Sequence, residues 1–448
     1  MNNFLSKSFS LNPALLLHVL MGYFLITLLL FFGCWIKLYF SIPMIALTLI
    51  SYNQWVKVCF NKIPTVYVSY QTVLILLVVS CFSLLLVGFG GVFEQKFDLF
   101  YRSNIVFSKL VFNDWPVIEQ EDKFHFLSYY LGYFLLPAFL CKLIGIQFFL
   151  LIEYFINSVL LFVLLCLFYV RFKHFKFLLF LLPSGIYWLV ERYLFSYNTG
   201  FRYFNFLNVL AHGPQQLFPS LFGLVIFLLL DKSILQKSYV FLLGILFFWS
   251  PFAVVGLSVL FSKFIFQTKF TFLNGLGILF ASMFLLFYVG KDASIYFQLI
   301  DFSSVGLNYI LFVFLDVMVV LLVCKPKFDL TFLFVVLFLL LLPFLHFGIY
   351  NDLLTKASIP CVIYFYYWNI SHVKFQVGRL ITMIFFLVYS ITSINHFLNL
   401  SKFYQGDKNI LCSYRNKKFS DFSTMGPEIQ NQYYSNIHSW FGTYLLRK

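Results

Sequence analysis

The sequence predicts an all-α polytopic membrane protein, and two observations lead to this fold class. Of the 448 residues, 61% are hydrophobic and only 11% are charged, whereas soluble domains carry about 25% charged residues. The second observation is that apolar runs recur along the chain, many of them near the ~20 residues that an α-helix needs to cross a bilayer. Short polar connections separate these runs, so we expect one helical bundle in lipid rather than several soluble domains.

The apolar runs also place the individual segments. Spans are expected at residues 13–32, 34–52, 72–92, 146–170, 177–192, 216–231, 271–290, 306–323, 330–348, 358–370 and 380–399. Two further runs are interrupted, because 126–143 contains Pro137 and 239–262 is broken at Trp249-Ser250-Pro251. With these two, the prediction is about 13 membrane segments.

The charged residues limit the classes of partner. Lys and Arg number 31 against 17 Asp and Glu, which gives a net charge of +14. The basic residues are scattered between the spans, as is typical of cytoplasmic loops that contact anionic membrane lipids. The alternative is that some of them bind an anionic, lipid-linked substrate. No basic cluster points to nucleic acid as a partner.

Loop charges then predict the orientation. The segment 93–124 has six acidic and four basic residues and should lie outside, whereas the basic turn 171–176 should lie inside. Only one crossing fits between them, so 126–143 is expected to lie in the outer interface. By the same reasoning, 239–262 should be a hairpin of two short helices that turns at Pro251. The N-terminus is then inside.

This orientation defines the domain organisation. Residues 1–399 are expected to form the transmembrane helical domain. Within it, residues 93–145 form an outer loop with juxtamembrane helices. Residues 400–448 are polar and mixed in charge, and we expect them to form a small C-terminal cap on the periplasmic or extracellular side.

The first candidate site residues follow an early span. Asp98 lies at the membrane surface, where partial desolvation turns a carboxylate into a usable base. Arg102 stands four residues later, so it either pairs with Asp98 on one helix face or binds a phosphate with its planar fork. Asn104 completes this polar group. Farther on, Glu119, Glu121 and Asp122 are weak candidates for a divalent metal, but a solvated acidic turn is the simpler interpretation, and we expect no metal site.

Two later outer loops supply further candidates. In 191–217, Arg202, His212 and Gln215 are polar groups among interfacial aromatic residues. In 348–358, Asn351, Asp352 and Lys356 lie between two spans. Asp352 and Lys356 have the spacing of a structural ion pair, and the alternative is that Lys356 binds a lipid phosphate.

Two acids fall inside predicted spans, where charge is costly and usually faces a partner or a polar site. Glu153 is near the outer end of its span and is a candidate for facing the site. Asp316 is in the middle of its span, and protonation or pairing within the bundle is as good an interpretation as function. The chain has none of the phosphate-loop, zinc-protease or nucleophile-elbow motifs of soluble enzymes.

The order of these features resembles the GT-C-fold glycosyltransferases and related uncharacterised bacterial polytopic membrane proteins. The matching pieces are DLFYRSN from Asp98, DWPV from Asp114, LSYYLGYFLLPA from Leu127, GPQQ from Gly213, WSP from Trp249 and NDLLTKASIP from Asn351. In that family, the first outer loop carries a catalytic Asp, followed by a segment like 127–145. Asp98 stands at the place of that acid.

The resemblance implies a glycosyltransferase of the bacterial inner membrane. Such an enzyme moves a sugar from a polyprenyl-phosphate-linked donor to a glycan, lipid or protein acceptor on the outer face. Asp98 would deprotonate the acceptor, and Arg102, Arg202 or Lys356 would stabilise the leaving phosphate. No cofactor is required, because the phosphate is already a good leaving group.

Other classes remain open. A polysaccharide polymerase or ligase also uses lipid-linked sugars, but its large outer loop usually comes late in the chain, not early. A non-catalytic glycolipid transporter or flippase would need charged groups along a central path, and only Glu153 and Asp316 fit that description. A purely structural membrane subunit is the remaining interpretation.

Overall fold

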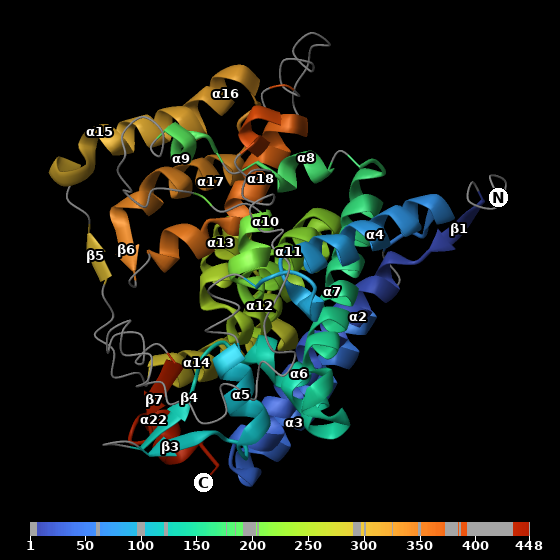
Figure 1. Cartoon of the computed structure of the whole chain (residues 1–448), viewed down its shortest axis with the longest axis vertical. Coiled ribbons are helices and arrows are strands. Elements are labelled where there is room, and N and C mark those ends of the chain that lie inside the picture. Colours follow the sequence, from blue (N-terminus) through green and yellow to red (C-terminus); the bar gives the residue numbers. More distant parts are fainter. Residues whose placement is uncertain are drawn as a thin grey trace.

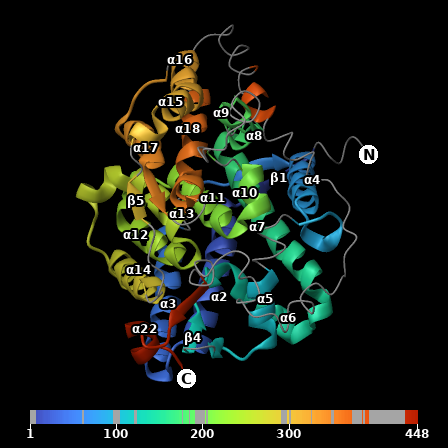
Figure 2. The same cartoon turned by 60° about the vertical axis from the view of Figure 1, so that its left-hand side comes forward.

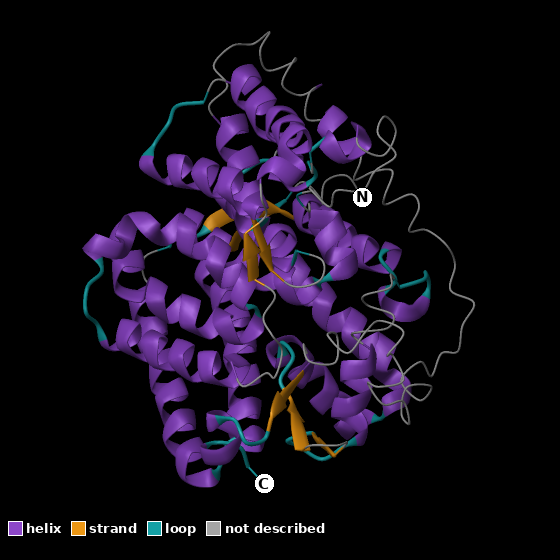
Figure 3. Cartoon of the chain, turned by 90° about the vertical axis from the view of Figure 1, so that its left-hand side faces the viewer, coloured by secondary structure: helices purple, strands orange, loops and turns teal. Residues whose placement is uncertain are grey.

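The structure is a computed structural model, and it is mostly helical (Figure 1, Figure 3). It describes residues 7–59, 63–95, 104–120, 124–175, 177–183, 185–190, 203, 206–289, 297–299, 302–324, 326–347, 351–371, 384, 387–391 and 433–447. Four helices in these ranges are long and apolar enough to cross a membrane, and they cover residues 13–35, 146–172, 272–289 and 306–324. The prediction of a helical integral membrane protein is confirmed at this level.

Most of the apolar helices pack into one bundle. The longer ones are α2 (Pro13–Trp35), α3 (Leu38–Cys59), α4 (Tyr70–Leu86), α6 (Leu131–Ile144), α7 (Phe149–Phe172), α11 (Pro214–Leu229), α12 (Lys232–Trp249), α13 (Pro251–Phe261), α14 (Phe272–Val289), α15 (Phe302–Val313), α17 (Leu330–Leu341) and α18 (Ile359–Ser371). The shorter ones are α5 (Asn104–Phe112), α8 (Phe177–Leu181), α9 (Tyr187–Val190), α10 (Phe206–His212), α16 (Val319–Cys324) and α22 (Trp440–Tyr444).

Capping residues explain where several of these helices begin. The Asn12 side chain accepts a hydrogen bond from the backbone N–H of Ala14, and Pro13 fills the first helical position of α2. Ser69 accepts from the Thr72 N–H at the start of α4. Such side chains satisfy N–H groups that have no partner within the helix, which matters most where water is scarce.

The expectation of an all-α protein misses three short antiparallel sheets (Figure 3). They join β1 (Ser8–Leu11) to β2 (Val66–Ser69), β3 (Ile118–Gln120) to β4 (Phe124–Leu127) and β7 (Tyr434–Asn436), and β5 (Phe297–Leu299) to β6 (Leu345–Phe347). Each strand lies beside a helix end or in a connection. There the backbone groups need partners that no helix provides.

The most extensive helix–helix contact in the described part of the chain is that between α12 and α14, and two glycines lie in it. A Cβ added at Gly244 would overlap the Gly277 backbone, and a Cβ at Gly277 would overlap the backbone of Val240 and Phe241. Small residues at such crossings let backbones approach closely, which is how helices associate where lipid removes the hydrophobic driving force. Figure 2 shows α14 beside α12.

The expected hairpin in 239–262 is confirmed. Helices α12 and α13 meet at Ser250, whose hydroxyl caps α13 by accepting from the Ala253 N–H at 3.0 Å. The far ends also come together, because the Lys269 N–H donates to the Gln236 carbonyl at 3.2 Å. The basic residues that flank this hairpin in the sequence therefore lie at the same end of the bundle.

The expected continuous span at 177–192 is wrong. Two short helices, α8 and α9, stand there instead, with Pro183 and Gly185 between them. Gly185 has a φ of 90°, which is outside the helical range and is readily adopted only by glycine. Hydropathy alone cannot detect such a break, since Pro and Gly hardly reduce the average over the run.

Candidate functional site

The structure describes only part of the predicted site. Five of the predicted residues lie outside the described ranges, and they are Asp98, Arg102, Glu121, Asp122 and Arg202. The remaining seven fall into three groups. Asn351, Asp352 and Lys356 share one turn, and His212 and Gln215 lie on either side of the turn that opens α11. Asn104 and Glu119 have local partners.

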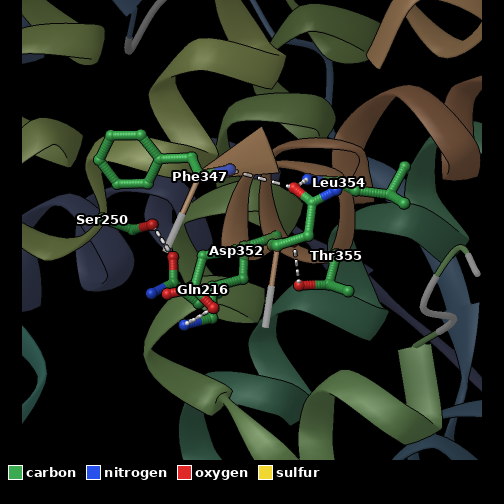
Figure 4. A network of polar contacts seen from close by, with 8 residues as sticks. Gln216, Ser250, Phe347, Asp352, Leu354 and Thr355 are labelled. Atoms are coloured by element: carbon green, nitrogen blue, oxygen red, sulfur yellow. Dashed lines mark hydrogen bonds and ion pairs between the residues drawn. The ribbon is translucent and has the colours of Figure 1, made fainter. Parts of the chain in front are cut away.

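Asp352 and Lys356 form an ion pair in which the Lys356 Nζ lies 3.0 Å from the Asp352 Oδ1 (Figure 4). Both side chains are largely shielded, with exposed fractions of 18% for Lys356 and 14% for Asp352. The expected pairing is thus confirmed. It lies in a single π-helical turn, η9 (Leu353–Ala357), and such turns occur frequently at functional sites.

Asn351 fixes the turn that carries this pair. Its side-chain Oδ1 accepts hydrogen bonds from the N–H of Leu354 at 3.3 Å and of Phe347 at 3.4 Å (Figure 4). Its backbone has a φ of 49°, in the left-handed region that asparagine adopts more easily than most residues. Asn351 is therefore a structural residue that orients Asp352 and Lys356.

Lys356 lies close to two aromatic rings. Its Nζ is 6.0 Å from the ring centre of Tyr130 and 5.8 Å from that of Phe252. Contacts at this distance are attractive when they are shielded from water. Tyr130 directly precedes α6 and Phe252 follows the Ser250-Pro251 turn, so three segments distant in sequence meet at this ammonium group.

A second polar contact joins the first turn of α11 to the Ser250-Pro251 turn, which directly precedes Phe252. The Ser250 hydroxyl hydrogen-bonds to the Gln216 Oε1 in the first turn of α11 (Figure 4). The Gln216 Nε2 is buried close to the Tyr130 hydroxyl. The Gln215 Oε1 is buried and has no hydrogen-bond partner among the described residues. A buried amide without a partner is costly, and it marks a place where a ligand or water can supply the missing bond.

Tyr130 links the two polar groups. Burial raises the pKa of its hydroxyl well above the usual range, and the neighbouring Tyr129, Asp352 and Tyr288 raise it further, while the Gln216 side chain opposes the shift. The hydroxyl therefore stays protonated. Its backbone has a φ of 37°, an unfavourable conformation for a bulky residue. Tyr130, which lies near Lys356, and Asn351, which precedes it by five residues, both have positive φ values.

Glu153 lies next to Tyr133 of α6. Its side chain is 1% exposed and lies close to the Tyr133 hydroxyl, one turn into α6 from Tyr130. The Asn157 Nδ2 donates to the Tyr133 hydroxyl at 3.1 Å. The Trp249 Nε1 donates to the Thr27 hydroxyl at 3.0 Å and completes this buried layer. Glu153 thus lies next to a residue of α6 that is one turn from Tyr130, and its role at the site stays a prediction.

The other described candidates have local contacts. The Asn104 Nδ2 donates to the Gln95 Oε1 at 2.9 Å, at the start of α5. Glu119 lies 2.5 Å from the Lys109 Nζ, so a carboxylate that was considered for a metal is instead half of an ion pair. His212 ends α10, next to the turn that opens α11. In the described part of the chain, no three His, Cys, Asp or Glu side chains are grouped to hold a metal ion.

Three residues that contribute to this group were not predicted from the sequence. Tyr130, Gln216 and Ser250 were seen only as parts of the pieces LSYYLGY, GPQQ and WSP, and none was a candidate in its own right. The available signal was the presence of polar groups beside helix-breaking Gly or Pro in otherwise apolar segments. This signal does not predict which of these turns contact one another in the folded protein.

The arrangement can recognise an anionic oxygen. It supplies one ammonium group, a protonated phenol and an amide nitrogen, all donors, held by four segments at one end of α6, α11 and α13. Comparisons of the chain with protein-family models, with curated proteins and with solved structures give no match.

Proposed function

We propose that the chain is a membrane glycosyltransferase that takes a sugar from a polyprenyl-phosphate-linked donor. The acceptor is a lipid, a glycan or a protein, and the reaction takes place on the outer face of the bacterial inner membrane. The observation that carries the proposal is the position of Lys356, which is paired with Asp352 and lies against the Tyr130 and Phe252 rings. Four of the six sequence pieces behind the resemblance meet at this one place.

The chemistry required of the site is modest. The acceptor oxygen attacks the anomeric carbon, the bond from that carbon to the phosphate oxygen breaks, and the bonding electrons leave with the phosphate. The acceptor proton passes to a base, a role that the resemblance gives to Asp98. In this proposal, Lys356 and the Tyr130 hydroxyl stabilise the negative charge on the departing phosphate.

The position of Lys356 suits a lipid-linked phosphate better than a soluble nucleotide. Its ammonium is mostly shielded and lies beside aromatic rings, where a polyprenyl chain finds apolar contact. A single point charge is enough for a phosphomonoester or phosphodiester, since Lys binds phosphate without demanding a fixed bidentate geometry. Asp352 keeps the ammonium in place when no phosphate is bound.

Binding is tested on the purified full chain in detergent, with a polyprenyl phosphate and the matching polyprenol as probes. We expect the phosphate, and not the alcohol, to raise the melting temperature of the wild type. Lys356→Met should weaken phosphate binding about 10- to 100-fold, the range for one charge-assisted hydrogen bond. Lys327→Met, the same change in the connection between the predicted spans 306–323 and 330–348, should have no effect. Equal stabilisation by alcohol and phosphate would overturn the role of Lys356.

Catalysis is tested separately. In membrane vesicles that contain the wild-type chain and a labelled polyprenyl-phosphate sugar, label should enter a new glycosidic product, and Asp98→Asn should abolish this at normal protein level. Movement of the donor across the membrane without a new glycosidic bond would instead establish a flippase. Product formation that Asp98→Asn leaves unchanged would remove the catalytic assignment of that residue.

A further inference from the structure

The segment 433–447 lies directly against the start of α6. Its strand β7 extends the β3–β4 pair, with Phe126 opposite Ser435 and Leu127 opposite Tyr434 (Figure 1, Figure 2). Just beyond this pairing, the Ser128 N–H donates to the Tyr433 carbonyl at 2.8 Å. The Ser435 hydroxyl donates to the Ser128 hydroxyl, also at 2.8 Å.

The other end of the segment is fixed to a different part of the bundle. Leu446 pairs with Ile36 as an isolated β-bridge, and the Arg447 N–H donates to the Trp35 carbonyl at 2.8 Å. Lys37 holds the same region through its ammonium, which donates to the Thr443 carbonyl at 2.8 Å. The segment is therefore held at both ends, and Tyr433 cannot shift without losing backbone pairing.

From Tyr433, a row of rings leads to the proposed site. The ring centres of Tyr433 and Tyr129 are 4.2 Å apart, and those of Tyr129 and Tyr130 are 4.4 Å apart. Tyr130 in turn lies over the Lys356 ammonium. Tyr433 is 1% exposed and Tyr129 is 6% exposed, so both rings are packed inside the protein.

Tyr130 needs such support because of its backbone. Its φ of 37° is unfavourable for a residue with a large side chain, and such a conformation persists only where the surroundings enforce it. On one side the enforcement comes from α6, where Gly132 packs so closely on Trp249 that a Cβ would overlap the indole ring. On the other side it comes from the β4–β7 pairing and the Tyr433 ring.

We propose that Tyr433 is a positioning residue for the phosphate site: it holds Tyr130 against Lys356 through Tyr129. The inference rests on the proposed function, because Tyr130 and Lys356 are the groups assigned to the phosphate. It makes the segment 433–447 a part of the site, although it is separated in sequence from every other contributor by more than 70 residues.

The test compares Tyr433→Ala with Leu446→Ala, its control at the far end of the same segment, and with Tyr433→Phe, which keeps the ring. All are made in the full chain and purified in detergent. Two quantities are measured: the affinity for a polyprenyl phosphate, and the hydrogen-exchange rates of the backbone amides of residues 128–133.

Both alanine variants should lower the melting temperature, since each loses a buried side chain. Only Tyr433→Ala should also speed exchange in 128–133 and weaken phosphate binding, by at least about fivefold, the low end of measured couplings between sites. Tyr433→Phe should keep both the exchange rates and the phosphate affinity of the wild type. Unchanged exchange in Tyr433→Ala, or an equal effect of Leu446→Ala, overturns the inference. If the wild type binds no polyprenyl phosphate, the proposed function fails, and the exchange rates still decide whether Tyr433 supports Tyr130.

Discussion

Asp316 and Gly185 are in such close contact that a Cβ on Gly185 would overlap the Asp316 carboxylate. The same carboxylate, through its Oδ1, accepts hydrogen bonds from the N–H of Ile186 at 2.8 Å and of Tyr187 at 3.0 Å. An acid in the middle of a span thus accepts from the N–H groups at the start of α9, which have no acceptor within the helix. Its burial has a structural explanation, which weakens the interpretation of Asp316 as a station on a transport path.

Gly185→Ala should destabilise the protein by about 3 kcal/mol, because the new methyl group meets the carboxylate and the left-handed backbone becomes unfavourable. The measurement is the melting temperature in detergent. The control is Gly22→Ala in α2, where nothing lies within 4 Å of the added carbon and little change is expected. Equal melting temperatures for the two variants would contradict the contact.

Substitutions of Asp316 separate a capping role from a charged one. Asparagine keeps the Oδ1 that accepts both bonds, so Asp316→Asn should cost at most about 1 kcal/mol and keep activity. Alanine leaves two N–H groups without an acceptor, and Asp316→Ala should cost about 2–4 kcal/mol. If Asp316→Asn folds normally but abolishes substrate movement or transfer, the acid has a function beyond capping.

The contact of α12 with α14 gives a prediction with its control in the same helix. Gly277→Ala should destabilise by about 1–3 kcal/mol, since its methyl group overlaps the backbone of Val240. Gly275→Ala, two residues away, has open space within 4 Å and should be neutral or slightly stabilising. Unfolding in a denaturant series measures both. Similar losses in the two variants would mean that the helices do not cross at Gly277.

The Lys109–Glu119 pair supplies a test by double substitution. Lys109 is 7% exposed, so Glu119→Gln leaves an ammonium buried without its counter-charge and should cost about 2 kcal/mol. Adding Lys109→Met removes that charge and should recover most of the loss. Protein stability with and without divalent cations completes the experiment. A cation effect that disappears in Glu119→Gln would revive the metal interpretation of this acid.

What the sequence could predict depended on the range over which each interaction acts. The Asp352–Lys356 pair follows from a spacing of four residues, and the α12–α13 turn follows from Pro251 together with the basic residues at its ends. The contact between Gln216 and Ser250 does not, because it joins two turns whose partners are decided by the packing of α11 against α13. Neither does the conformation of Tyr130, since nothing in LSYYLGY requires a positive φ at a tyrosine. The break at Gly185 was hidden by the apolar character of its neighbours.

The contacts of Lys37 and Arg447 set a limit on the order of assembly. The Lys37 ammonium and the Thr443 carbonyl are 406 positions apart in the sequence, and the Arg447 guanidinium and the Gly33 carbonyl are 414 apart. Contacts of such separation carry a high loop-closure cost and form slowly. The backbone of residues 35–37, which connects α2 to α3, is synthesised before the segment 433–447 and gains these hydrogen bonds only after that segment is made. Conditions that delay the docking of the segment 433–447 should leave the backbone groups of residues 35–37 available to pair with other β-strands.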